Sequence, residues 1–205
     1  MKRLLIPAIF AFLVLSGHAF ASKGFSISLG TEYLPLSKVE FGNPAVNSYE
    51  IYDNMSVESG LYYCFEPGFR AGTIASFFNK NVDTGNSSSD VFFWGIGILG
   101  DFEFKISESG NTRLLLGTDT GFAKLRDSND FSKRSDDSYW ASFFGGIRYF
   151  FSSRYFFELD YRMKWQEFEL IGAPVDKSFD FSGSSLRLSL GYGFFPDNSP
   201  AEGSK

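Results

Sequence analysis

From residue 25 onward the chain repeats a two-residue alternation of apolar and polar positions, and no stretch keeps apolar residues at helical spacing for three turns. A period of two is typical of β-strands whose faces meet different surroundings. Gly, Pro, Asn, Asp or Ser residues bound each alternating segment. The predicted strands span residues 25–34, 56–65, 69–78, 91–106, 113–124, 139–151, 155–165 and 185–195.

The connections between these predicted strands alternate in length. The long ones are residues 35–55, 79–90, 125–138 and 166–184, and the short ones are residues 66–68, 107–112 and 152–154. Short turns at one rim and long loops at the other are typical of up-and-down barrels. The sequence therefore predicts an all-β, eight-stranded antiparallel up-and-down barrel with four long loops at one end.

The two faces of the predicted strands differ sharply in composition. One face is apolar and aromatic and carries no Asp, Glu, Lys or Arg. The other face carries most of the strand glycines and all of the strand charges. These charges are Glu32, Glu58, Arg70, Asp101, Glu103, Lys105, Arg113, Asp119, Lys124, Arg148, Glu158, Asp160, Arg162, Lys164 and Arg187.

The glycines indicate which face points outward. Glycine weakens a strand and packs nothing, so a water-facing surface gains nothing from it. The narrow lumen of an eight-stranded barrel does need small residues, because long charged side chains can cross it only beside small neighbours. Aromatic residues near the strand ends also resemble the interfacial girdles of membrane barrels. We therefore predict a transmembrane β-barrel with the apolar face toward lipid; a soluble, lipocalin-like barrel is the alternative.

The first residues have the three parts of a secretory signal peptide. Lys2 and Arg3 precede an apolar run over 4–15, and Ala19 and Ala21 supply the small residues of a cleavage site. The apolar run is too short to span about 30 Å of hydrocarbon. We expect a signal peptide at 1–21, an outer-membrane β-barrel domain at 22–195 and a short periplasmic tail at 196–205.

The signal peptide, the eight alternating strands and the final strand together resemble the small outer-membrane barrels of the OmpA/OmpX type. That strand reads Leu188-Ser-Leu190-Gly-Tyr192-Gly-Phe194-Phe195. The resemblance implies residence in the cell outer membrane among outer-membrane lipid and lipopolysaccharide. It also implies that the barrel assembly machinery reads the aromatic-ended last strand, and we expect a monomer.

Composition limits the chemistry that this barrel can carry. The chain has 205 residues and a net charge of −5, with no basic stripe that would suit nucleic acid. Its one histidine, His18, leaves with the signal peptide, whereas the enzymatic outer-membrane barrels lean on a histidine base. Cys64, the single cysteine, falls on the charged face as a small buried side chain, and no Cys/His cluster has metal-site spacing. We therefore predict no catalytic residue, no cofactor and no metal site.

The charges of the lumen are expected to pair with one another. If outward Phe151 and Tyr155 flank the turn at 152–154, then Arg148 lies opposite Glu158. We hypothesise a lumen ion-pair network that plugs the barrel, because buried charges are costly unless they are neutralised. Its members are Glu32, Arg148, Glu158, Asp160, Arg162, Lys164 and Arg187. A gated proton or ion path is the alternative.

The predicted long loops hold the residues that could contact a partner. Cationic side chains suit lipopolysaccharide phosphates or a surface ligand, and exposed aromatic side chains suit a protein partner. The candidates are Arg126, Lys133 and Arg134 in one loop and Phe41, Tyr49 and Tyr52 in another. The function that we expect is a non-enzymatic envelope-structural or loop-mediated surface-binding role. A narrow or gated channel and, less favoured, a lipid-modifying enzyme are the alternatives.

Overall fold

The computed structural model describes residues 23–41, 47–65, 68–83, 88–129, 133–171 and 176–194. The expected signal peptide and periplasmic tail lie outside these residues. Among the described residues, no helix is long and apolar enough to cross a membrane. The strands are β1 (Gly24–Phe41), β2 (Asn47–Phe65), β3 (Phe69–Asp83), β4 (Ser88–Lys105), β5 (Thr112–Asn129), β6 (Lys133–Phe150), β7 (Tyr155–Leu170), β8 (Lys177–Asp180) and β9 (Gly183–Phe194).

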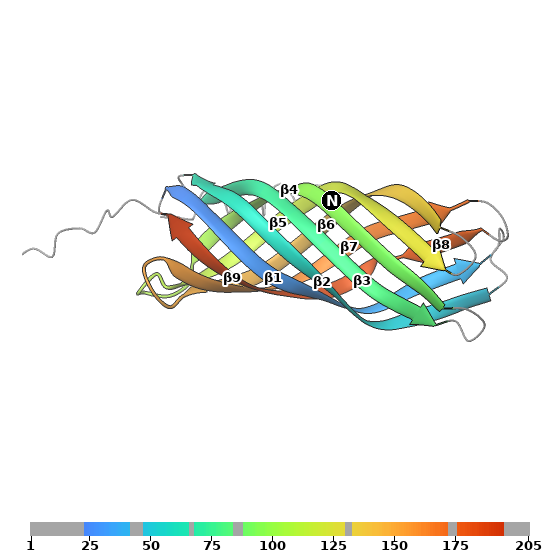
Figure 1. Cartoon of the computed structure of the whole chain (residues 1–205). Helices are drawn as coiled ribbons and strands as arrows, with labels where there is room; N and C mark the ends of the chain where they lie inside the picture. The colour runs from blue at the N-terminus through green and yellow to red at the C-terminus, as the bar shows by residue number, and fades with distance from the viewer. Residues whose placement is uncertain are drawn as a thin grey trace, which may run out of the picture.

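These strands form one closed antiparallel barrel (Figure 1). Each strand from β2 to β7 pairs with its neighbours in the sequence, and β8 and β9 follow each other along one barrel position between β7 and β1. Together β8 and β9 are the eighth strand of the barrel, so the predicted eight-stranded up-and-down topology is confirmed. The strands cross the barrel axis obliquely, as closure of a sheet requires.

Near the short turns, the apolar face points out and the charged face points in. Leu29 and Ile98 on the outer wall are 62% and 63% exposed, whereas Arg148 and Glu158 are fully buried. Outward aromatic residues mark both edges of this band. Tyr155 and Trp165 of β7 lie ten positions apart, which is about 33 Å along a strand and about 25 Å across a bilayer at a tilt of about 40°. The predicted orientation is confirmed, and this region is named the membrane section. The prediction that every strand charge lies on the inward face is wrong for Lys124, which shares the outward parity of Phe122 and has a side chain that is 40% exposed.

The prediction of four long loops is wrong, because most of those residues extend the strands. β1 continues to Phe41 and β2 already begins at Asn47, and the other three connections shorten in the same way. We name the extensions the distal section. It comprises residues 34–41, 47–54, 78–83, 88–93, 123–129, 133–139, 166–170 and 177–182.

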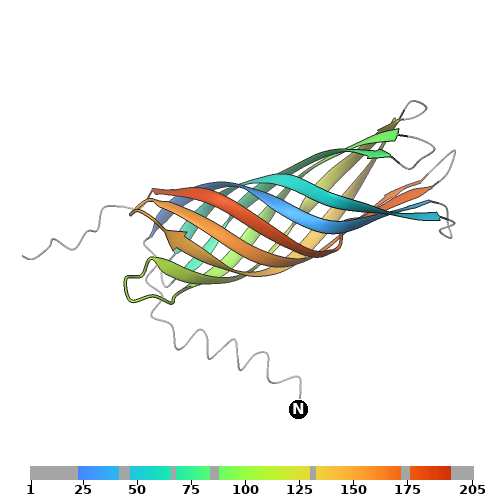
Figure 2. The same cartoon turned by 90° about the horizontal axis from the view of Figure 1, so that it is seen from below.

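The distal section divides into two lobes (Figure 2). Within the described residues, the β2–β3 pairing ends at Ser56 and Phe78, and the β6–β7 pairing ends at Trp140 and Gln166. The pairings inside each lobe continue almost to the hairpin ends. One lobe is therefore β3-β4-β5-β6, and the other is β2-β1-β8-β7.

Side chains replace the backbone ladder at the seam between β6 and β7. The Ser138 hydroxyl donates a hydrogen bond to the Glu167 carbonyl oxygen. The Glu169 N–H donates to Asp136 Oδ2 over 2.8 Å. These contacts satisfy backbone polar groups on the side of β7 that faces β6, beyond the point where the β6–β7 pairing ends.

Candidate functional site

The interior of the membrane section is filled by eleven charged side chains, which we call the lumen network. All of them lie on inward positions of their strands, and each is at most 8% exposed. The network consists of Arg70, Arg113, Arg148, Arg162 and Arg187 with Glu58, Asp101, Glu103, Asp119, Glu158 and Asp160.

Glu158 is the hub of the half that lies toward the short turns. Its Oε1 atom accepts a hydrogen bond from Arg70 Nη1 over 2.8 Å and is also paired with Arg148. Its Oε2 atom lies 3.3 Å from Arg187 Nη2. Arg148 and Glu158 face each other across the β6–β7 ladder, as the turn at 152–154 predicts. Arg70 comes from β3 on the far wall, which shows that side chains meet across the whole lumen.

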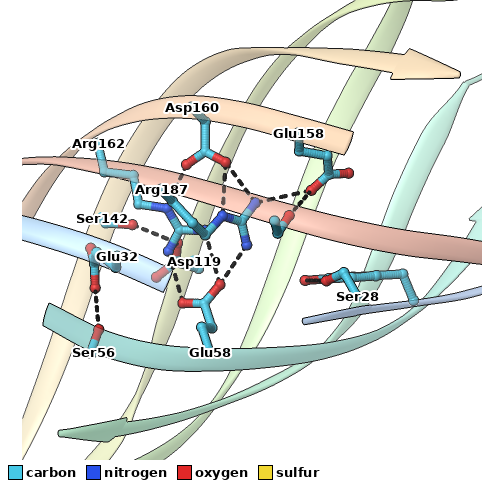
Figure 3. A network of polar contacts seen from close by, with 12 residues as sticks. Ser28, Glu32, Ser56, Glu58, Asp119, Ser142, Glu158, Asp160, Arg162 and Arg187 are labelled. Atoms are coloured by element: carbon cyan, nitrogen blue, oxygen red, sulfur yellow. Dashed lines mark hydrogen bonds and ion pairs between the residues drawn. The ribbon is translucent and has the colours of Figure 1, made fainter. Parts of the chain in front are cut away.

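Arg162 and Arg187 organise the other half of the network (Figure 3). Asp160 forms ion pairs with both arginines. Its Oδ1 atom lies 2.7 Å from Arg162 Nε, and its Oδ2 atom lies 2.7 Å from Arg187 Nη2. Glu58 also pairs with both guanidinium groups. Asp119 Oδ2 lies 3.2 Å from Arg162 Nη1. Each guanidinium therefore bridges several carboxylates, which suits its planar set of donors.

Lys164 and Glu32 form a separate ion pair closer to the distal section. Lys164 Nζ lies 3.2 Å from Glu32 Oε2, and the Ser185 hydroxyl donates to Glu32 Oε1 over 2.7 Å. The structure thus brings Arg148, Glu158, Asp160, Arg162 and Arg187 into one network but leaves this pair beside it.

The charges of the lumen network nearly cancel. Its five arginines and six carboxylates sum to 5 − 6 = −1, and every carboxylate has at least one guanidinium partner. Burying a charge is costly unless it is paired and hydrogen-bonded. The network meets this condition, because its guanidinium and carboxylate groups hold one another in place.

Aromatic side chains close the lumen at the short-turn end. The Arg70 guanidinium carbon lies 4.3 Å from the centre of the Tyr62 ring, and that of Arg148 lies 4.4 Å from the centre of the Phe156 ring. Arginine over an aromatic face is favourable, and more so without water.

A second aromatic layer, which we call the distal plug, fills the space between the two lobes. It consists of Phe78, Phe93, Phe168, Phe179 and Phe181, each at most 4% exposed. Ring centres of Phe78, Phe93 and Phe181 lie 5.2 to 5.6 Å apart. The cavity between this plug and the lumen network measures about 10 Å³, which is room for about one water molecule.

Glycine makes this filling possible at two positions in particular. A Cβ atom on Gly60 would lie 1.9 Å from the Tyr62 hydroxyl oxygen, and one on Gly121 would lie 2.2 Å from the Trp140 ring. Large side chains can therefore fold across the lumen only over these bare backbone positions, as the sequence predicts for lumen glycines.

The cysteine and the acidic side chains of the interior are the groups that could bind a metal ion. Cys64 is a free thiol and is 1% exposed. No group of three or more His, Cys, Asp and Glu side chains among the described residues is placed to hold a metal ion.

The residues predicted for loop contacts lie on strands. Arg126 is exposed on β5, whereas the Phe41 ring at the end of β1 packs against the apolar interior and lies 5.4 Å from Lys177 Nζ. Tyr49 and Tyr52 belong to β2, and Lys133 and Arg134 belong to β6. The side chains of these last four residues lie outside the described part of the chain.

The predicted network omitted six members that the structure includes. These are Glu58, Arg70, Asp101, Glu103, Arg113 and Asp119. Their inward parity is visible in the sequence, but their partners are not, because most of these contacts join strands that are far apart in the chain. The small lumen diameter of an eight-stranded barrel could have indicated these contacts, because it brings inward side chains of opposite walls within reach of one another.

Comparisons with known proteins agree with this architecture. No protein-family model matches the chain, and no curated protein matches it in sequence. The crystal structure of Neisserial surface protein A superposes with a TM-score of 0.59 at 14% identity, covering 85% of this chain and 99% of that one. The outer membrane protein OprG from Pseudomonas aeruginosa gives a TM-score of 0.56 at 11% identity over 88% and 99% of the two chains.

A third similar structure holds a ligand. It is Ail, the attachment invasion locus protein of Yersinia pestis, in complex with the heparin analogue sucrose octasulfate, with a TM-score of 0.50 at 17% identity over 85% and 100% of the two chains. Identities this low establish a shared fold and no shared activity. The chain therefore has the fold of the small eight-stranded outer-membrane β-barrels, which is the type that its strand pattern and final strand resemble.

Proposed function

We propose that this protein resides in the outer membrane and acts through its wall and its distal section, in an envelope-structural or surface-binding role without enzymatic activity. The observation that carries this proposal is the filled lumen. The lumen network and the distal plug fill the described interior with buried side chains, and the cavity between them measures about 10 Å³. A pathway for solutes would require many paired charges to separate, which is costly in a low-dielectric interior.

The outer wall of the membrane section supports the proposed location. Its outward residues are apolar between two aromatic girdles, which is the surface that hydrocarbon and its interfaces select. We place the short turns on the periplasmic side and the distal section outside the cell. The last strand ends at Phe194 after Tyr192, and we propose that the assembly machinery recognises this end and that the barrel is a monomer.

The distal section offers the surface for binding. Beyond Phe92 and Tyr139 at its base, the described outward residues of its strands are polar, with Arg126 on β5 and an acidic group on β6 and β7. Asp136, Asp137, Glu167 and Glu169 line a shallow depression of about 360 Å³ at the seam. A sulfated ligand such as the one in the Ail complex would be repelled there. We therefore propose that an anionic surface ligand would contact the β5 side.

Conductance of the purified full-length barrel in planar bilayers tests the filled-lumen proposal. We expect no discrete current steps at moderate voltage. A variant with Asp160→Gly and Arg187→Gly keeps the net charge of the lumen network but removes side-chain volume, and it is expected to raise the current. Stable stepwise conductance of the wild-type protein would instead establish the channel alternative.

A further inference from the structure

The wall of the membrane section carries an apolar groove on the outside of strands β3 to β7. Its volume is about 610 Å³, and its lining is almost wholly apolar. Outward Gly100, Thr118 and Gly145 are the small residues of the lining, and Phe102, Phe143 and Met163 are among its large ones.

The glycines of this groove differ from those of the lumen. A Cβ atom on Gly100 would lie 3.5 Å from its nearest neighbour, the Phe69 ring, which is ordinary contact. One on Gly145 would meet the flexible end of Leu116 at 3.3 Å and the Leu115 carbonyl oxygen at 3.8 Å, which is ordinary contact. Neither position has the positive φ that requires glycine. The missing side chains therefore shape the outer surface, whereas Gly60 and Gly121 make room inside.

The groove lies within the band that faces hydrocarbon. It begins at Phe69 and Phe104, beside the short turns, and reaches Met163, two positions before the girdle residue Trp165. The Trp165 ring lies 6.2 Å from the ring of Phe143, which lines the groove. The groove therefore extends from one aromatic girdle toward the other, along the depth that an acyl chain occupies.

The charge around the groove differs between its two ends. At the short-turn end, Lys105 follows Phe104 on an inward position of β4, and its side chain lies against Gly110 of the turn rather than on the outer wall. Beyond the other end, outward Asp137, Glu167 and Glu169 surround the seam between β6 and β7. A phosphate headgroup is therefore repelled at the distal end and meets no such repulsion from the lining at the short-turn end.

We propose that this groove binds one acyl chain of a glycerophospholipid from the periplasmic leaflet, with the phosphate at the short-turn end. The proposal rests on the membrane location and the orientation given above. Filling the groove buries apolar surface on both partners, and its bare positions let the chain lie closer to the barrel backbone than elsewhere on the wall. A lipid A molecule would approach from the distal end, where the acidic side chains oppose its phosphates.

Photo-crosslinking tests the proposal directly. The full-length barrel is reconstituted in phosphatidylethanolamine vesicles that contain a small fraction of the same lipid with a diazirine in its acyl chain. Cross-linked residues are then mapped by mass spectrometry. We expect cross-links concentrated on Phe102, Phe143 and Met163, and on the order of tenfold rarer at Leu29 and Leu188, which are exposed on the wall away from the groove.

Two substitutions that fill the groove test whether the cross-links depend on it, and a third substitution outside the groove is the control. Gly145→Phe and Thr118→Phe, on different strands, are each expected to abolish the enrichment, and the second serves if the first fails to fold. Ala75→Phe adds the same ring to an outward position of β3 outside the groove and is expected to keep it.

Uniform cross-linking along the wall, or enrichment that survives both groove substitutions, would overturn the proposed lipid site. A different result would overturn the choice of lipid: no enrichment in the groove with the phospholipid probe, but enrichment there with a diazirine-bearing lipid A. Neither result would affect the filled lumen, whereas a barrel that fails to insert into vesicles at all would overturn the proposed location itself.

Discussion

The membrane section and the distal section share the two-residue alternation of apolar and polar positions, but the apolar positions face outward in the membrane section and inward in the distal section. In β7, Met163 and Trp165 point outward below the transition and Glu167 and Glu169 point outward above it, while inward Lys164 gives way to inward phenylalanine. The reversal follows the surroundings, because hydrocarbon selects apolar outer residues and water selects polar ones. The distal section is therefore built like a small water-soluble β-sandwich on top of a membrane barrel.

The interiors differ as well, and this difference predicts how each region responds to substitution. The membrane section holds its walls together with ion pairs and a few inward apolar side chains, since most of its apolar residues face the lipid. The distal section holds its two lobes together with the distal plug. One ion pair, between Lys177 Nζ and Asp127 Oδ2 at 2.7 Å, also crosses between the lobes.

Loss of a central guanidinium is expected to have the largest effect. Arg187→Ala leaves Asp160, Glu58 and Glu158 buried with fewer partners, and we expect the free energy of unfolding to fall by about 3–5 kcal/mol. Urea unfolding in lipid vesicles, followed by tryptophan fluorescence, measures this change. The control is Arg126→Ala on the exposed distal wall, with an expected change within about 0.5 kcal/mol. Equal effects of the two substitutions would contradict the account.

One substitution placed in both regions tests the reversal of the outer wall. Ile98→Arg puts a charge on the lipid-facing surface and is expected to cost roughly 2–4 kcal/mol. Asn79→Arg puts the same charge on an exposed outward position of the distal section and is expected to change stability by less than about 0.5 kcal/mol. The same vesicle unfolding assay applies, and a similar cost at both positions would mean that both lie in hydrocarbon.

The ion pair between the lobes is expected to act locally. Lys177→Ala leaves the carboxylate of Asp127 buried, which is expected to cost about 1–3 kcal/mol. Hydrogen exchange should accelerate in β8 and in the distal part of β5, with the membrane section unchanged. Lys124→Ala breaks an exposed pair with Asp137 and is expected to cost less than about 0.5 kcal/mol. Faster exchange throughout the barrel would show that the two sections are not separable.

The smallest effect is expected at the acidic seam, where the pKa of Glu167 is raised. Partial burial is the first cause, and Asp180, Glu169 and Glu40 add to it. The folded state therefore holds this proton more tightly than the unfolded chain does. Its stabilising contribution is full below the ordinary Glu pKa and is lost as the pH rises through the raised pKa.

The protection of amides at the β6–β7 seam, which is the exchange rate corrected for the intrinsic fall of that rate in acid, should consequently increase from neutral to acidic pH. Glu167→Gln should flatten this dependence, whereas Glu108→Gln, in the short turn after β4, should leave it intact. A seam that opens as the pH falls would contradict a raised pKa of the Glu167 carboxyl.

Much of the membrane section could be predicted from the sequence, because parity along a strand fixes which side chains share a face. The short turn at 152–154 was enough to set Arg148 opposite Glu158. Contacts such as Arg70 with Glu158 could not be predicted the same way, since they depend on which walls face each other across the closed barrel.

The distal strands escaped prediction for a different reason. Residues such as Lys38, Asn79 and Glu169 look like loop residues when a strand is expected to be apolar outside. Their neighbours Val39, Phe78 and Phe168 are buried and complete a normal alternation of opposite phase. The outer groove was equally hidden, because Gly100 and Gly145 belong to different strands and meet only in the folded wall.

A nitroxide accessibility scan along β7 tests the central claim most directly. Single cysteines replace residues 159–170 in a Cys64→Ala background, and collision with oxygen and with a water-soluble nickel chelate is measured in vesicles. We predict oxygen preference at Leu159, Tyr161 and Met163, nickel preference at Glu167 and Glu169, and protection from both at the inward positions between them. Oxygen preference that continues through Glu169, or inward positions that collide freely with the nickel chelate, would contradict the reversal and the filled lumen.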